Sequence, residues 1–159
     1  MPLAISFPST GRVVYKKVKL KAWLAHWCRC FMHKILIVDD SPTIRKMVRA
    51  SLQGLEPSEF LEASTGLEAI EQLAVAGVQL VVLDLNMPDM HGIDVLKFLR
   101  RHQHYQNLPI VVLTTRGDET SRETAEAAGA TAYLTKPFVP QMLATTVREL
   151  LQAGAGTRR

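Results

Sequence analysis

Four short, mostly apolar runs that each lead into a polar or charged residue constrain the fold of this chain most strongly. The runs lie at 35–38, 78–83, 110–113 and 132–135, and segments with helical spacing separate them. Strands joined by helical crossovers run parallel, and the carboxyl ends of parallel strands meet at one edge of the sheet. The residues that follow the runs are therefore expected to converge in one pocket. They are Asp39 and Asp40, Asp84, Thr114 and Lys136.

The segments between the runs carry the signals of amphipathic helices. Ser41 is a suitable N-cap, and Pro42 suits the first helical turn. Apolar residues then recur at helical spacing up to Leu55. Gly77 and Gly129 mark helix ends, because glycine adopts the left-handed conformation at little cost.

A further strand at 59–63 and a last helix at about 140–152 complete the pattern. Five strands that alternate with five helices predict an α/β domain of three layers over residues 32–152. The remaining residues, 153–159, are expected to form a flexible tail.

The charge of the chain is unevenly distributed. The formal net charge is +4 at pH 7, yet residues 1–31 hold six Lys or Arg and no Asp or Glu. The rest of the chain has two more acidic than basic side chains. The basic character therefore gives no support for direct DNA binding by the predicted domain.

Two interpretations of residues 1–31 stay open. We favour an N-terminal extension or a mis-assigned start, because Met32 immediately precedes the first strand as an initiator methionine would. The alternative is a short basic amphipathic helix on an acidic membrane surface, since apolar residues from Leu20 to Phe31 follow helical spacing.

Cysteine content and hydropathy limit the location of the protein. Both cysteines, Cys28 and Cys30, lie in the basic segment, so the predicted domain has no disulfide framework. No apolar run approaches the ~20 residues that span a bilayer. We expect a cytoplasmic protein without a transmembrane segment.

Three carboxylates, a hydroxyl and a lysine in one pocket describe a site for a metal ion and a phosphoryl group. Each residue alone has a plainer interpretation: an Asp after a strand often caps the next helix, and Lys136 could be a solvated charge. No structural rule requires all of them on one edge, so their joint occurrence favours the chemical interpretation.

These motifs closely resemble the receiver domain of two-component response regulators. The resemblance rests on Val38-Asp39-Asp40-Ser41, on the stretch from Leu83 to Gly92, on the stretch from Pro109 to Thr114, and on the stretch from Ala132 to Phe138. It covers about residues 33–152 and is greatest for the compact single-domain members of the CheY type. It implies a flavodoxin-like sheet with the strand order 2-1-3-4-5.

The resemblance also implies a role for each acidic residue. Asp84 would be the phosphoacceptor, which attacks a phosphohistidine and forms an acyl phosphate. Mg²⁺ would be held by Asp40 and Asp84 directly, by Asp39 through water and by the backbone carbonyl of Asn86.

The remaining signature residues would bind and sense the phosphoryl group. Lys136 would pair first with Asp84 and then with a phosphoryl oxygen, and its bond to Pro137 resembles the family's cis peptide. Thr114 would donate a hydrogen bond to the phosphoryl group. Tyr133 matches the aromatic switch position, which alters the surface of the fourth helix, fifth strand and fifth helix. Arg116 lies at a family position that modulates hydrolysis of the acyl phosphate.

The predicted function is a stand-alone receiver, a phosphorylation-dependent interaction switch rather than an enzyme. Its partners would be a sensor histidine kinase or a histidine phosphotransfer protein, with an unidentified downstream target. Only 22 residues follow Pro137, too few for a DNA-binding output domain. Kinase specificity is expected on the surface of the first helix, at residues such as Arg45, Lys46 and Arg49.

Particular residues disfavour two other functions. A phosphatase or phosphotransferase with its own aspartyl-phosphate turnover is disfavoured, because Asn86 stands where such hydrolases usually carry a general acid. A degenerate receiver that works without phosphorylation is disfavoured because the signature residues are intact.

Overall fold

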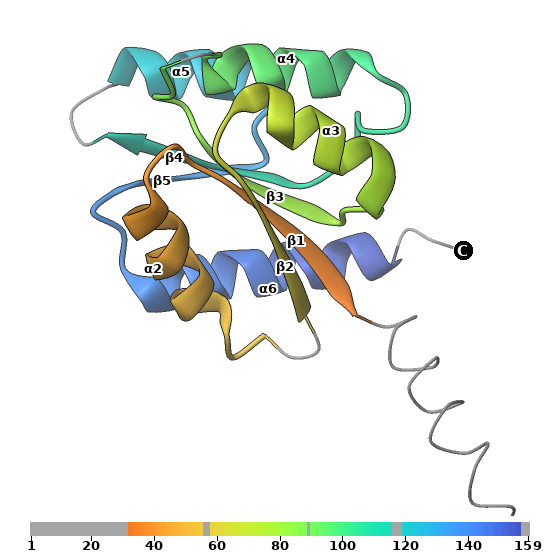
Figure 1. Ribbon diagram of the computed structural model, residues 1–159, viewed down its shortest axis with the longest axis vertical. Coiled ribbons are helices and arrows are strands. Elements are labelled where there is room, and N and C mark those ends of the chain that lie inside the picture. The colour runs from red at the N-terminus through yellow and green to blue at the C-terminus, as the bar shows by residue number, and fades with distance from the viewer. Residues whose placement is uncertain (1–31, 56–57, 89, 116–118, 157–159) are drawn as a thin grey trace, which may run out of the picture. The chain divides into compact units, whose positions relative to one another are not determined.

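The computed structural model describes residues 32–55, 58–88, 90–115 and 119–156, which form a parallel sheet covered by helices on both faces (Figure 1). The strands are β1 (His33–Val38), β2 (Ser58–Ala63), β3 (Leu80–Asp84), β4 (Ile110–Thr115) and β5 (Ala132–Lys136). Their order is β2-β1-β3-β4-β5, and every pair is parallel. The predicted flavodoxin-like α/β fold with the order 2-1-3-4-5 is therefore confirmed.

Five helices connect or follow the strands. They are α2 (Pro42–Leu52), α3 (Gly66–Ala76), α4 (Gly92–Arg101), α5 (Glu119–Ala127) and α6 (Pro140–Gly156). Figure 1 shows α3, α4 and α5 on one face of the sheet and α2 and α6 on the other. None of the helices in the described part of the chain is long and apolar enough to cross a membrane.

The three central strands supply side chains to two separate cores. Leu36, Leu83 and Val112 pack in the core beneath α3, α4 and α5. Ile37 and Val82, one residue away in their strands, pack in the core beneath α2 and α6. Successive strand residues point to opposite faces, which explains why these runs are apolar throughout. Each fully buried Leu, Ile or Val contributes about 1.5–3 kcal/mol.

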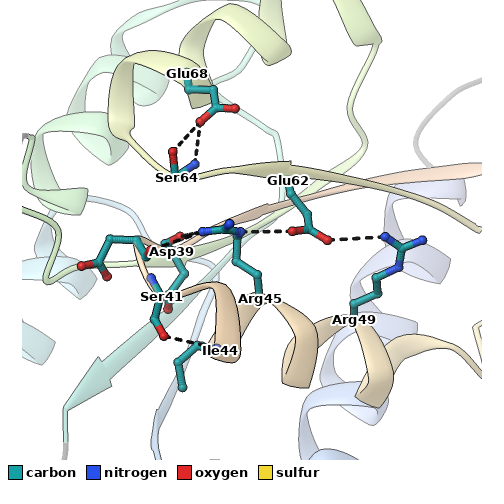
Figure 2. Close-up of polar contacts among 9 residues, drawn as sticks. Asp39, Ser41, Ile44, Arg45, Arg49, Glu62, Ser64 and Glu68 are labelled. Carbon is teal, nitrogen blue, oxygen red and sulfur yellow. Dashed lines mark hydrogen bonds and ion pairs between the residues drawn. The ribbon is translucent and has the colours of Figure 1, made fainter.

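The helix caps lie where the sequence predicts them. The Ser41 hydroxyl accepts a hydrogen bond from the Ile44 amide at 3.4 Å (Figure 2). Gly77 ends α3 with φ 64° and Gly129 follows α5 with φ 93°, in the left-handed region that favours glycine. The Lys136–Pro137 peptide bond is cis, as the resemblance implied.

Several boundaries and orientations differ from the prediction. Strand β3 begins at Leu80 rather than at residue 78, and α6 continues to Gly156 rather than ending at residue 152. Met47 in α2 and Leu67 in α3 are exposed, although both are large apolar residues within helices that pack on the sheet. An amphipathic stripe can be wider than the surface that the sheet covers, so its edge residues reach solvent.

Some predictions fall outside the described residues. Residues 1–31 lie outside them, so both interpretations of that segment stay predictions. Arg116 and residues 157–159 do as well.

The start of α3 generates a prediction about stability and pH. Glu68 accepts hydrogen bonds from the Ser64 amide at 2.7 Å and the Ser64 hydroxyl at 2.8 Å (Figure 2). These bonds favour the charged form and lower the pKa of Glu68. A carboxyl group with a lowered pKa stabilises the fold above its unfolded pKa and loses that effect as pH falls.

We therefore expect Glu68→Gln to reduce the free energy of unfolding by about 1 kcal/mol at pH 7. The difference from the wild type should shrink as pH falls through the lowered pKa of Glu68. Urea denaturation at several pH values measures both. Glu71→Gln, at an exposed position of the same helix, is the control. A pH-independent difference, or an equal effect of the two substitutions, would contradict the assignment.

Candidate functional site

The sequence-predicted residues gather at the carboxyl edge of the sheet. Asp39 directly follows β1, and Asp84 is the last residue of β3. Thr114 is the penultimate residue of β4 and Lys136 is the last of β5, and both strands run beside each other in register. Asp39, Asp84 and Thr114 are buried polar residues, whereas Asp40 is exposed at the rim.

Lys136 bridges two carboxylates that come from different strands. Its Nζ lies 2.7 Å from Asp39 Oδ2 and 2.9 Å from Asp84 Oδ1. Only 1% of Asp39 and 2% of Asp84 is exposed. The Ser41 amide donates to the second oxygen of Asp39 at 2.9 Å. One ammonium group therefore balances two buried acids.

The two contacts of Lys136 are not equivalent. The contact with Asp39 has hydrogen-bond geometry. The contact with Asp84 has an ion-pair distance but lacks that geometry, so Asp84 Oδ1 has no hydrogen-bond partner among the described residues. A buried oxygen that is ion-paired but not hydrogen-bonded is available to bind another group.

Burial and charge shift the pKa values in this pocket. Burial raises the pKa of Asp39, and this outweighs the hydrogen bonds from Lys136 and Ser41, which lower it. Burial acts to lower the pKa of Lys136, but the hydrogen bond to Asp39 and the negative charges of Asp39 and Asp84 hold that pKa above its usual range. The lysine therefore stays positively charged at neutral pH.

The three acidic residues fit a divalent cation. Asp39, Asp40 and Asp84 each offer a carboxylate oxygen, and these oxygens lie within 4.8 Å of one another. Two like charges ~4 Å apart repel by about 4 kcal/mol at an effective dielectric of ~20, which a cation between them would relieve. Oxygen donors are the ligands that Mg²⁺ prefers. The Asp84 oxygen that lacks a hydrogen bond fits the same ion.

Asn86 is placed at the rim of the pocket. Its exposed side chain donates to the Thr115 hydroxyl at 2.9 Å, which ties the loop after β3 to the end of β4. Ligation by its backbone carbonyl stays a prediction.

Comparison with known proteins decides the family. A family model described as the response regulator receiver domain matches residues 35–148. The chain belongs to the response regulator receiver domain family. Members of this family are typically phosphoacceptor switches rather than enzymes, and a receiver implies a histidine kinase partner.

Chemotaxis proteins are among the relatives of this receiver. Chemotaxis protein CheY1 of Helicobacter pylori is 39% identical over 125 residues, which cover 78% of this chain and 98% of that protein. A CheY homologue of Campylobacter jejuni is 37% identical over 124 residues, 77% of this chain and 95% of that protein. A solved response regulator from Chloroflexus aurantiacus aligns with a TM-score of 0.72 at 35% identity, over 76% of this chain and 98% of its own.

The receiver holds Tyr133 in a contact with α5. The Arg122 guanidinium lies over the Tyr133 ring, with 3.9 Å between its central carbon and the ring centroid. Arg122 also forms an ion pair with Glu126 at 3.2 Å. Tyr133 is half-buried and packs against the core beneath α3, α4 and α5. The predicted switch residue therefore lies between a core and a charged surface.

Gly92 supports the site in a way that sequence reasoning missed. A Cβ at this position would lie 2.1 Å from the backbone oxygen of Asp84 and 2.8 Å from the Cα of Leu85. The Gly92 amide donates to the Leu85 carbonyl at 3.1 Å. The first residue of α4 thus packs directly on the backbone that carries Asp84. Glycine in the turn after Asp84 was the available signal, because glycine permits a close backbone approach.

We expect Gly92→Ala to reduce the free energy of unfolding by about 1–3 kcal/mol, because the added methyl group overlaps the Asp84 backbone. Gly54→Ala is the matched control, since a Cβ there meets nothing within 4 Å. It should change stability by less than about 0.5 kcal/mol. Urea denaturation compares the two variants. Equal stabilities would show that α4 can move away from Asp84 at little cost.

Proposed function

We propose that this receiver is a magnesium-dependent switch that accepts a phosphoryl group on Asp84 from the phosphohistidine of a histidine kinase or phosphotransfer protein. One observation carries the proposal: a buried, non-hydrogen-bonded Asp84 oxygen lies 2.9 Å from Lys136 Nζ. The acid pair Asp39 and Asp40 lies beside it. A nucleophile, a fixed positive charge and a set of metal ligands are what phosphoryl transfer requires.

In the proposed transfer, an Asp84 carboxylate oxygen attacks the phosphorus atom and forms an O–P bond. The N–P bond to the donor histidine breaks, and its imidazole nitrogen keeps the electron pair. When bound, Mg²⁺ would offset negative charge on the phosphoryl oxygens. The Lys136 ammonium pairs with the Asp84 carboxylate before the transfer. After the transfer it would pair with a phosphoryl oxygen.

A switch fits the site better than an enzyme with its own turnover. Hydrolysis of the acyl phosphate would gain from a general acid two residues after Asp84. That position is Asn86, whose side chain cannot donate a proton as an acid and is bound to Thr115. The acyl phosphate is therefore expected to persist long enough to signal.

Thr114 and Tyr133 would carry the signal. Thr114 lies two residues after Val112 in β4, so both point to the same face of the sheet. Val112 pairs with Tyr133 of β5, and both pack in the core on that face. Thr114 and Tyr133 thus share a face on adjacent strands. Movement of the Thr114 hydroxyl toward a phosphoryl oxygen would leave space that the Tyr133 ring can fill.

The surface proposed to change is that of α5, β5 and α6. A new charge of about −2 on Asp84 would favour one of two pre-existing Tyr133 arrangements. The downstream partner would bind the exposed surface around Tyr133 and Arg122.

Phosphorylation of Asp84 can be tested directly. We expect intact mass to rise by one phosphoryl group after incubation with phosphoramidate and Mg²⁺, and not after chelation of the metal. Asp84→Asn should abolish the gain, because the amide is not a nucleophile. Asp94→Asn, at an exposed position of α4, should leave it unchanged. An unmodified wild-type protein in the presence of Mg²⁺ would refute the proposed function.

The coupling of Thr114 to Tyr133 has a separate test. We expect Thr114→Ala to accept the phosphoryl group but to lose the change at Tyr133, because the hydroxyl that senses the group is gone. Ring resonances of labelled Tyr133 before and after phosphorylation report the change. Thr135→Ala, at the exposed strand position paired with Thr114, is the control. A wild-type response in Thr114→Ala would exclude Thr114 as the sensor.

A further inference from the structure

The Arg45 guanidinium lies between the Asp39 backbone and the Glu62 carboxylate (Figure 2). Its Nη1 donates to the backbone carbonyl oxygens of Asp39 at 2.8 Å and of Asp40 at 3.3 Å. Only 17% of its side chain is exposed. Sequence reasoning placed Arg45 among the surface residues that select the kinase, whereas its guanidinium faces the loop that carries two proposed metal ligands.

The other side of the guanidinium is anchored to β2. Arg45 Nε donates to Glu62 Oε2 at 3.1 Å. Glu62 lies opposite Ile37 in the pairing of β1 with β2, immediately before the end of both strands. Arg49, one turn further along α2, approaches the second Glu62 oxygen at 3.4 Å. The position of Arg45 is therefore fixed from the sheet.

The two carbonyl contacts select one backbone shape. Successive carbonyls of an extended strand point in opposite directions, so one nitrogen cannot bind both. Binding the Asp39 and Asp40 carbonyls together requires the turned backbone that follows β1. Two other contacts hold the same turn: the Asp39 amide donates to the Ala63 carbonyl at 3.1 Å, and the Ser41 amide donates to Asp39 Oδ1 at 2.9 Å.

We propose that Arg45 is a positioning residue, which holds the Asp39–Asp40 turn in the geometry that a divalent cation needs. This inference rests on the proposed magnesium-dependent function. Arg45 acts on the site through the backbone carbonyls of Asp39 and Asp40, and it would not contact the metal or the phosphoryl group. A lysine cannot replace it fully, because a single ammonium nitrogen cannot bind Glu62 and both carbonyls in the same fork.

The chain provides a matched control for this proposal. Arg45 and Arg49 lie one turn apart on α2 and bind the same carboxylate, but only Arg45 is bonded to the Asp39 and Asp40 carbonyls. The Arg49 side chain is 52% exposed. Substituting Arg49 therefore removes a positive charge and a Glu62 contact without disturbing the turn.

The first measurement is magnesium affinity of the full chain by titration calorimetry. We expect Arg45→Met to raise the dissociation constant about tenfold, the scale seen for residues that orient metal ligands. Arg45→Lys should have a smaller effect in the same direction, and Arg49→Met should stay within about twofold of the wild type. The phosphorylation rate of Arg45→Met should recover when Mg²⁺ is saturating.

The second measurement needs no metal. In metal-free protein, the Ser41 amide should exchange with solvent about tenfold faster in Arg45→Met, because the turn that presents it to Asp39 is loosened. The Gly92 amide, bonded to Leu85, should keep its rate. If Arg45→Met does not fold, Arg45→Lys carries both tests.

Wild-type magnesium affinity and wild-type Ser41 exchange in a folded Arg45 variant would overturn the inference. A wild-type protein that binds no Mg²⁺ would instead overturn the proposed function. Amide exchange would then decide alone whether Arg45 positions the turn.

Discussion

A single ammonium group between two buried carboxylates is the interaction on which the rest of this structure depends. Lys136 Nζ lies within 3 Å of Asp39 and Asp84, and both acids are almost completely buried. Charges removed from water are tolerated only when they are paired. Pairing with Lys136 makes the buried acids compatible with folding. Because one lysine faces three neighbouring acids, the pocket keeps an excess of negative charge and still attracts a cation. The parallel sheet makes this possible, because only strands that end at one edge bring these residues together.

The protein controls this pocket through backbone as well as through side chains. Gly92 lets α4 pack against the Asp84 backbone, and Arg45 binds the carbonyls of Asp39 and Asp40. Fixing peptide groups limits the positions of the carboxylates while leaving their oxygens available as ligands or nucleophile. Preorganised groups of this kind need little rearrangement when charge develops. Gly92 and Arg45 thus hold the acids without competing with a metal for the carboxylate oxygens.

The strand ends predicted the convergence of the acid pair, Asp84 and Lys136, at one edge of the sheet. The sheet order was implied by the resemblance to receiver domains. Ser41, Gly77 and Gly129 act locally, so their caps were predictable as well. Arg45 was not. An arginine on a polar helix position normally points to solvent, and its burial depends on Glu62, which arrives on another strand. Gly92 was visible only as a turn residue, because its packing on Asp84 depends on the tertiary path of α4.

The acid pair and Tyr133 are held by contacts of different strength, which matters for the proposed signalling. The acid pair is held by several short contacts, whereas Tyr133 is held on its outer side by a stack with Arg122. A cation–π contact at a partly exposed site contributes about 0.5–1 kcal/mol. About 1.4 kcal/mol changes a population ratio tenfold, so this stack alone cannot lock the ring. In the proposed switch, phosphorylation of Asp84 would therefore need only a modest change in free energy to shift the Tyr133 equilibrium, and Arg122 would help to set where that equilibrium lies.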